Sequence, residues 1–404
     1  MVPAALPPLA LYVHLPWCVA KCPYCDFNSH AAPARIPAEA YVDALIADLE
    51  QARADAAGRP LISVFIGGGT PSLFPPQAIE RLLAAVRARF DLPPDLEITL
   101  EANPGTLEAE RFAGFRAAGV NRLSLGVQSF ADAMLTALGR IHDGADAERA
   151  AQAARAAGFD HVNLDLMYGL PGQTSAEADA DLARAIALGP DHLSWYELTI
   201  EPNTAFWSAP PALPDGDTMA GIETAGAARL EAAGYQRYEV SAWAAAAEHR
   251  CRHNLNYWQF GDYLGIGAGA HAKITHEDGS IERQARIRAP DKYLQRAAAG
   301  TAIAHRDGLA PADAAFEFLL NALRLPQGFA RACFEQRTDV PLAWLEEPLA
   351  AAEADGLIER TATAVRPTPT GLNYLNDLLA RFAAATEQWR PARDRVGRIP
   401  VAVE

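Results

Sequence analysis

Three cysteines lie within eight residues near the start of this 404-residue chain, at Cys18, Cys22 and Cys25. Four thiolates normally complete a structural zinc site, so three thiolates leave one coordination position open. On a 4Fe–4S cluster, three cysteines hold three irons and leave the fourth iron to a ligand from outside the protein. The compact spacing favours the cluster, because one loop can wrap it. Zinc stays open as the alternative, with Cys251 or Cys333 as a fourth ligand.

Other polar residues gather where successive β-rich segments end. They are residues 67–70, Glu101 with Asn103, Gln128 and Asp165. Parallel α/β proteins build their sites at the carboxyl edge of the sheet. A helix cap or a turn explains one such residue, but it does not explain four successive strand ends. We therefore expect a shared site at this edge.

These residues must be positioned by a regular alternation of β-rich and helical segments, which runs from residue 9 to about residue 240. The β-rich segments are residues 9–15, 61–67, 96–102, 122–128, 161–169 and 192–199, and helical ones include 38–57 and 76–90. Such alternation implies parallel βαβ units, and nearly continuous apolar strands imply a sheet covered by helices. Six units predict an α/β fold, as a full or partial (β/α)6-type barrel. A doubly wound open sheet is the alternative.

The rest of the chain has a different character. After a proline-rich break at 209–217 we expect a helix at 217–234, a strand at 235–243, and an aromatic, glycine-rich segment at 253–272 that threads back over the barrel. From residue 311 the pattern is helix, helix, short hairpin and helix, which predicts a small, mainly helical, winged-helix-like domain; this is no evidence of DNA binding. The predicted domains are residues 1–240, 241–310 and 311–385, followed by a mobile tail at 386–404.

The composition restricts the class of protein. Half of the residues are hydrophobic and 21% are charged, as in ordinary globular proteins. We find no run of about 18 apolar residues and no secretory signal at the N-terminus. Five cysteines, mostly clustered, indicate a reducing cytoplasm rather than a disulfide framework. A net charge of −15 argues against broad nucleic-acid binding.

The pattern CxxxCxxC, directly after the first predicted strand, resembles the radical S-adenosylmethionine (SAM) superfamily. "YVHLPWC", "FIGGGTPSLF", "EANPG", "LSLGVQSF", "LGRIHD" and "NLDLMYGLPGQT" resemble more narrowly its oxygen-independent coproporphyrinogen III oxidase branch, in order and approximate spacing. This resemblance implies a radical SAM partial barrel that binds a 4Fe–4S cluster and SAM. In that superfamily an electron from the cluster cleaves SAM, so an electron donor of the flavodoxin or ferredoxin type is also implied.

The resemblance assigns roles to residues of this chain. Cys18, Cys22 and Cys25 would hold the cluster. The residues that would surround SAM are Tyr12, Tyr24, Gly67, Gly68, Gly69, Thr70, Glu101, Gln128, Arg140 and Asp165. The glycines would let the backbone approach the ligand. Arg140 suits the SAM carboxylate, because its planar fork can bond both oxygens, whereas a surface salt bridge is its ordinary alternative.

Position 27 departs from the oxidase pattern. The oxidases continue as CxxxCxxCxC, and the fourth cysteine position is Phe27 in this chain. Only 11 residues precede Tyr12, whereas the oxidases carry a longer N-terminal segment that helps to shape the substrate site. Both departures point to the sister HemW family, proposed to be haem chaperones that carry haem to acceptors such as respiratory enzymes, with transient membrane association. We expect haem as cargo and no coproporphyrinogen III oxidase activity; the oxidase remains the alternative.

A second motif agrees with this reading. "HNLNYW" contains His253, Asn254 and Tyr257, which match the HNxxY signature associated with haem binding in HemW-like proteins. A neutral imidazole is a good axial iron ligand, and a tyrosine can ligate or hydrogen-bond. Trp258 and Tyr257 offer flat apolar surface for a porphyrin. On this fragment alone, core aromatics and a structural histidine explain the motif better than haem binding does, and the resemblance reverses that preference; Cys251 is an alternative thiolate ligand. A zinc-stapled interaction protein is a third reading, which the GGGTP motif and the acidic charge disfavour.

Overall fold

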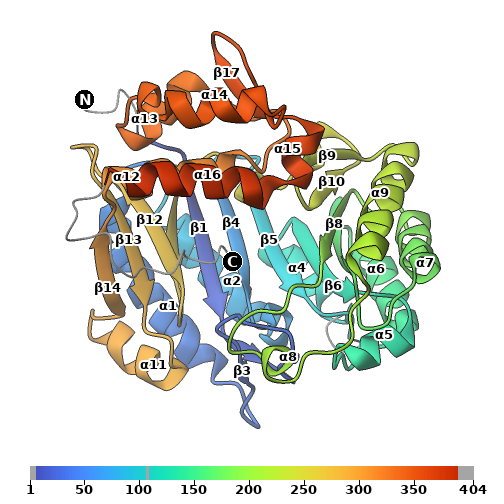
Figure 1. The fold of residues 1–404 in the computed structure, drawn as a ribbon. Coiled ribbons are helices and arrows are strands. Elements are labelled where there is room, and N and C mark those ends of the chain that lie inside the picture. Colours follow the sequence, from blue (N-terminus) through green and yellow to red (C-terminus); the bar gives the residue numbers. More distant parts are fainter. Residues whose placement is uncertain (1–5, 106–108, 390–404) are drawn as a thin grey trace.

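The computed structural model describes residues 6–105 and 109–389 and has a twelve-stranded sheet at its centre (Figure 1). Six parallel strands in the middle follow the order of the chain: β1 (Leu9–Leu15), β4 (Leu61–Gly68), β5 (Glu97–Ala102), β6 (Arg122–Gln128), β7 (His161–Tyr168) and β8 (His192–Glu197). A doubly wound sheet would reverse its strand order, and this one does not. The partial-barrel prediction is confirmed, and the doubly wound alternative is wrong.

Helices follow the strands and cover one face of the sheet (Figure 1). They are α1 (Ala38–Ala52), α2 (Pro76–Arg87), α4 (Phe112–Ala118), α5 (Asp132–Ala137), α6 (Gly144–Ala156), α7 (Ser175–Ala187) and α9 (Gly216–Ala232). Two of them begin with capping boxes, Asp143 with Asp146 and Thr174 with Glu177, which satisfy the free amide groups of the first turn. These local signals explain why the helices begin where they do.

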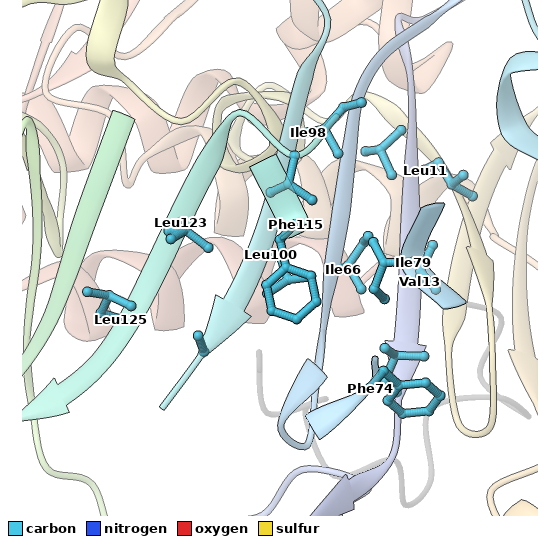
Figure 2. Packing of buried hydrophobic residues seen from close by; sticks show 14 of the residues in the cluster. Leu11, Val13, Ile66, Phe74, Ile79, Ile98, Leu100, Phe115, Leu123 and Leu125 are labelled. Atoms are coloured by element: carbon cyan, nitrogen blue, oxygen red, sulfur yellow. The ribbon is translucent and has the colours of Figure 1, made fainter. Parts of the chain in front are cut away.

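Alternate residues of each strand face the helices and form the main hydrophobic core. Figure 2 shows Leu11 and Val13 of β1 and Ile66 of β4 packing with Ile79 of α2, while Phe115 of α4 fills the space beside the neighbouring strands. Successive side chains of a strand point to opposite faces, so the residues between these face the barrel interior. Many of the side chains that face the barrel interior are polar, and the candidate site lies among them.

The sheet extends beyond the barrel at both edges. Next to β1 lies the parallel strand β11 (Asp262–Ile266), followed by the antiparallel β12 (His271–Thr275), β13 (Ile281–Arg286) and β14 (Ile303–Gly308). Next to β8 lies a hairpin, β10 (Ala242–Ala244) and β9 (Gln236–Glu239), where we expected one strand. The segment 253–272 begins in α10 (Arg252–Trp258), which lies against β4 and β1, and then joins the sheet. Helix α11 (Pro290–Ala298) packs on α1.

Buried ion pairs attach this extension to the barrel. The Asp262 carboxylate accepts hydrogen bonds from Lys273 at 2.8 Å and from Arg59 at 2.6 Å. Burial alone would raise the pKa of Asp262, but the neighbouring Lys273 ammonium lowers it below its usual value. Arg286 and Asp48 form a second pair, with a nitrogen–oxygen distance of 3.3 Å and both side chains fully buried. Buried polar contacts therefore add to the hydrophobic packing at this junction, where Leu264 and Ile266 of β11 belong to the main core.

The C-terminal domain has a second hydrophobic core, which also includes Phe260 and Ile281 of the preceding extension. Its elements are α12 (Pro311–Ala322), β15 (Phe329–Ala330), α13 (Arg331–Thr338), α14 (Glu346–Ala354), β16 (Ile358–Arg360), β17 (Ala364–Pro367), α15 (Pro369–Asn373) and α16 (Leu375–Glu387). A helix, a strand, two helices and a hairpin that pairs with the first strand have the order of a winged helix. Figure 1 shows this domain at the amino ends of the barrel strands. The predicted tail lies outside the described residues after Trp389.

No helix in residues 6–105 or 109–389 is long and apolar enough to cross a membrane.

Candidate functional site

The three cysteines lie on the loop that follows β1, at the carboxyl end of the barrel. Two short parallel strands, β2 (Trp17–Cys18) and β3 (His30–Ala31), hold the base of this loop. All three cysteines are partly exposed and none forms a disulfide. In the part of the chain that the structure describes, no three His, Cys, Asp or Glu side chains are arranged around a single-ion site. The loop thus presents separate thiols rather than a closed metal cage.

Neither of the other two cysteines can complete a zinc site on this loop. Cys251 is fully buried, and its thiol donates to Oε1 of Glu97, the first residue of β5, over 3.6 Å. That residue lies at the amino end of the barrel, opposite the cysteine loop. Cys333 packs against the core of the C-terminal domain. Three thiols without a fourth fit a 4Fe–4S cluster with one open iron, and they do not fit a four-thiolate zinc site.

Hydrogen-bond donors surround the thiols. Burial raises the pKa of Cys18, and a hydrogen bond with Thr70 opposes that rise. Burial likewise raises the pKa of Cys25, and Ser29, whose hydroxyl lies 3.7 Å from the sulfur, opposes it. Each donor favours the thiolate, which is the form that binds iron. The chemistry of these groups fits the cluster.

Arg140 holds the cysteine loop against the barrel. Its Nη2 donates to Oδ1 of Asn103 and to the carbonyl oxygen of Gly126, each at 2.7 Å, and its Nη1 lies 3.5 Å from Sγ of Cys22. Asn103 in turn donates to the Thr70 hydroxyl at 3.0 Å. We predicted that this guanidinium would meet the SAM carboxylate. That role stays a prediction; the contacts of Arg140 join the ends of β5 and β6 to the loop.

The glycine run makes room for protein groups. Gly68 has a φ of +114°, and a Cβ there would lie 2.6 Å from the imidazole of His14. A Cβ on Gly69 would lie 2.7 Å from the carbonyl oxygen of Trp17. The glycines therefore let the end of β4 pack closely against β1 and the base of the cysteine loop, and an approach of their backbone to a ligand stays a prediction. We did not identify His14 from the sequence, although it shares the interior register with Tyr12, whose hydroxyl lies 2.9 Å from its Nδ1.

Two acidic side chains, Glu101 and Asp165, face the barrel interior. Glu101 accepts a hydrogen bond from the amide of Gly68 at 3.1 Å, and Asp165 accepts from Ser124 at 3.0 Å and from Asn163 at 2.7 Å. Burial, with the charge of Asp165 as a smaller cause, raises the pKa of Glu101 to about 8, and burial also raises that of Asp165. Within the described residues neither carboxylate forms a salt bridge. Such a pair fits a cationic ligand, and SAM carries a sulfonium and an ammonium.

The remaining predicted SAM residues lie on the same side of the barrel. Gln128 has a φ of +67°, which is rare for a residue with a side chain, and its Oε1 accepts a hydrogen bond from the Tyr196 hydroxyl at 2.9 Å. The Tyr24 ring packs against Phe206 of the short helix α8 (Ala205–Ser208), with ring centroids 6.4 Å apart. Figure 1 shows α8 and β3 together at this end of the molecule.

The HNLNYW segment lies at a different place. His253 is only 2% exposed and its ring stacks on Phe65, with centroids 5.0 Å apart. Its Nδ1 lies 3.1 Å from the Ser63 hydroxyl, while its Nε2 has no hydrogen-bond partner among the residues described. Burial lowers the pKa of His253 to about 3, so the ring is neutral, as an iron ligand must be. A buried nitrogen without a partner is the feature expected of a ligand position.

Other residues of this segment serve the fold. The Glu97 carboxylate accepts hydrogen bonds from the amides of Arg252 at 3.0 Å and His253 at 3.1 Å, and so caps α10 from inside the barrel. We predicted that Trp258 would offer a flat surface to a porphyrin. In the structure the guanidinium of Arg324, two residues after the end of α12, lies over the Trp258 ring, 4.3 Å from its centroid. Asn254 and Tyr257 are partly exposed.

Comparisons with known proteins agree with this geometry. Residues 12–185 match the Radical SAM superfamily model, and residues 309–373 match the HemN C-terminal domain. The chain is 49% identical to the haem chaperone HemW of Escherichia coli K12 over 379 residues, which are 94% of this chain and 99% of that protein. It is 46% identical to HemW of Haemophilus influenzae, over 93% of this chain and 98% of that one. Among solved structures, the coproporphyrinogen III oxidase HemN of Escherichia coli superposes with a TM-score of 0.79 at 26% identity, covering 94% of this chain and 90% of the other.

Proposed function

Because this chain belongs to the HemW haem chaperone family of radical SAM proteins, we propose that it binds haem as cargo and transfers it to acceptor proteins such as respiratory enzymes. The observation that supports the proposal is the buried His253 imidazole, with Nδ1 held by Ser63 and Nε2 directed to no protein group. Iron binding at this nitrogen breaks no hydrogen bond to a described residue, whereas in a fully hydrogen-bonded core histidine it would. Asn254 and Tyr257 would complete the haem segment.

Cys18, Cys22 and Cys25 would hold a 4Fe–4S cluster, which supplies one-electron chemistry and one open iron when bound. The chain itself contributes two buried carboxyl groups, Glu101 and Asp165, whose pKa values are raised and whose charged forms a cationic ligand would stabilise. Tyr12, Tyr24 and the other SAM residues named above would surround that ligand. We place the protein in the cytoplasm, with a flavodoxin- or ferredoxin-type electron donor and transient contact with membrane-bound acceptors.

The burial of His253 imposes a condition on haem binding. At 2% exposure the imidazole cannot meet a porphyrin while α10 keeps its present position. Helix α10 has only seven residues, so it is a small element to displace. Its hydrogen bonds come from the Glu97 cap and from a few further residues, among them Ser63, Tyr238 and Asp262. We infer that haem binding displaces α10 from the amino end of the barrel and exposes Nε2 of His253.

Haem titration of variants tests this assignment. His253→Ala should weaken haem binding at least tenfold and change the Soret band, because an iron ligand is lost. His305→Ala is the matched control, since that histidine is exposed on β14, and it should bind haem like the wild type. Equal affinity and an unchanged spectrum in His253→Ala would show that the segment only packs, and would remove the local support for the haem site.

The oxidase is the second candidate, and the similarity to the solved oxidase structure favours it. Phe27 argues against it, because the position of a fourth cysteine is taken by a side chain that is 47% exposed. We expect no protoporphyrinogen IX from coproporphyrinogen III with SAM and a reductant. Product formation at enzyme-like rates would instead assign this chain to the oxidases.

A further inference from the structure

A chain of buried hydrogen bonds crosses the barrel interior from Asp165 to the start of α10. Nδ2 of Asn163 donates to Asp165 at 2.7 Å, and Oδ1 of Asn163 lies 2.6 Å from Nδ1 of His192. Nε2 of His192 lies 2.8 Å from the Tyr238 hydroxyl, which accepts from the amide of Cys251 at 3.2 Å. Cys251 is the N-cap residue of α10 and lies two positions before His253.

All donors in this chain can point the same way. The Asn163 carbonyl accepts from His192, so the imidazole carries its proton on Nδ1 and accepts at Nε2 from the Tyr238 hydroxyl. The Tyr238 oxygen is then left to accept from the Cys251 amide. Each bond polarises the next, and the series ends on the Asp165 carboxylate. Asn163, His192 and Tyr238 are each about 1% exposed, so water does not replace a bond that is lost.

We propose that His192 and Tyr238 are positioning residues that couple ligand binding at Asp165 to the position of α10, so that SAM increases the affinity for haem. This inference rests on the proposed function, which places SAM at Asp165 and haem at His253. Hydroxyl or ammonium donors of SAM compete with Asn163 for the Asp165 oxygens and so weaken the first bond of the chain. The hydrogen bond from the Cys251 amide to Tyr238 weakens with it, and α10 is displaced more easily from the amino end of the barrel.

The experiment compares haem affinity with and without saturating SAM, by Soret titration of the anaerobically reconstituted full-length protein. We expect SAM to tighten haem binding at least fivefold in the wild type. Tyr238→Phe, which keeps the ring and removes only the hydroxyl, should bind haem without SAM as tightly as the SAM-loaded wild type, and SAM should change nothing further. Tyr235→Phe is the control, because its buried hydroxyl donates to the Pro190 carbonyl outside the chain, and it should keep the fivefold effect.

A wild-type ratio of one or below, or a full SAM effect in Tyr238→Phe, overturns the coupling while leaving haem binding itself intact. Absence of haem binding in the wild type would instead overturn the proposed function. If Tyr238→Phe does not fold, amide hydrogen exchange in the haem-free wild type tests the coupling instead. SAM should accelerate exchange of the Cys251 amide at least fivefold, and unchanged exchange there would refute the proposal.

Discussion

Glu101 allows a quantitative test of how burial affects a carboxyl group in the barrel interior. Its pKa in the folded, ligand-free protein is about 8, against an ordinary value of 4.5, because burial disfavours the charged form. The folded state therefore binds more protons than the unfolded state between these two pH values. It follows that the free energy of unfolding falls as the pH rises from about 4.5 to about 8, and that this stability is fully present only below the lower value.

The size of the effect follows from the two pKa values. Each pH unit in this window changes the free energy of unfolding by about 1.4 kcal/mol, so about 5 kcal/mol is the upper limit. The Glu101 side chain is not completely buried, and water and relaxation reduce such penalties, so we expect about 1–3 kcal/mol. Glu101→Gln removes the charge and keeps the shape. Without SAM, the variant should be more stable than the wild type by this amount at pH 8, and nearly equal to it at pH 5.

Urea unfolding at pH 5, 6.5 and 8, with the cluster reconstituted anaerobically, measures this difference. The control is Glu359→Gln, because Glu359 is 53% exposed and pairs with Arg366 at the surface, and this variant should follow the wild-type curve. The same Glu101→Gln variant should bind SAM more weakly by about 1–3 kcal/mol, since a charged hydrogen-bond acceptor is lost. Parallel curves of unfolding free energy against pH for wild type and Glu101→Gln would refute the argument that burial raises the pKa of Glu101 in the folded protein.

Two further predictions concern the cysteine loop and the glycine run. Cys18→Ser should lose the cluster, seen as the loss of about four irons and four sulfides per chain, but it should still bind haem; Cys333→Ser should retain the cluster. A tightly bound zinc without sulfide in the wild type would contradict this. Gly68→Val should abolish SAM binding and lower the melting temperature, because a side chain there collides with His14 at a positive φ. Wild-type SAM affinity in this variant would show that SAM binds elsewhere.

The barrel was predictable because hydrophobic burial dominates its strands. In β7, Val162, Leu164 and Leu166 face the helices and are buried, and a strand of this kind is recognised from the sequence alone. The residues that face the barrel interior were harder to predict. An asparagine such as Asn163 is typical of turns when its hydrogen-bond partners are unknown. Its burial is tolerated because His192, Ser124 and Asp165 satisfy its amide, and the first two of these lie on neighbouring strands, 29 and 39 positions away.

The strands β12 to β14 could not be predicted for a related reason. Charged residues are normally assigned to the surface, yet Lys273 and Arg286 are about 1% exposed here. Their partners are Asp262 and Asp48, and the second of these is more than 200 positions away in the chain. Pairing makes their burial tolerable, and no periodicity in one segment reveals a partner in another. The contacts of Arg140 were hidden from the sequence for the same reason, since they come from the cysteine loop, from Asn103 after β5 and from Gly126 in β6.

The attachment of the cysteine loop has a consequence for synthesis of the chain. Asn28, three residues after Cys25, donates through its amide to the carbonyl oxygens of Ala268 and Arg288, both at 2.9 Å. The outer edge of β1 likewise has no partner until β11 is made. At about 5–20 residues per second, a ribosome takes roughly 12–50 s to reach those partners after the cysteines have been added. During translation the loop therefore lacks its final anchors and β1 keeps an open edge, which exposes the nascent chain to aggregation.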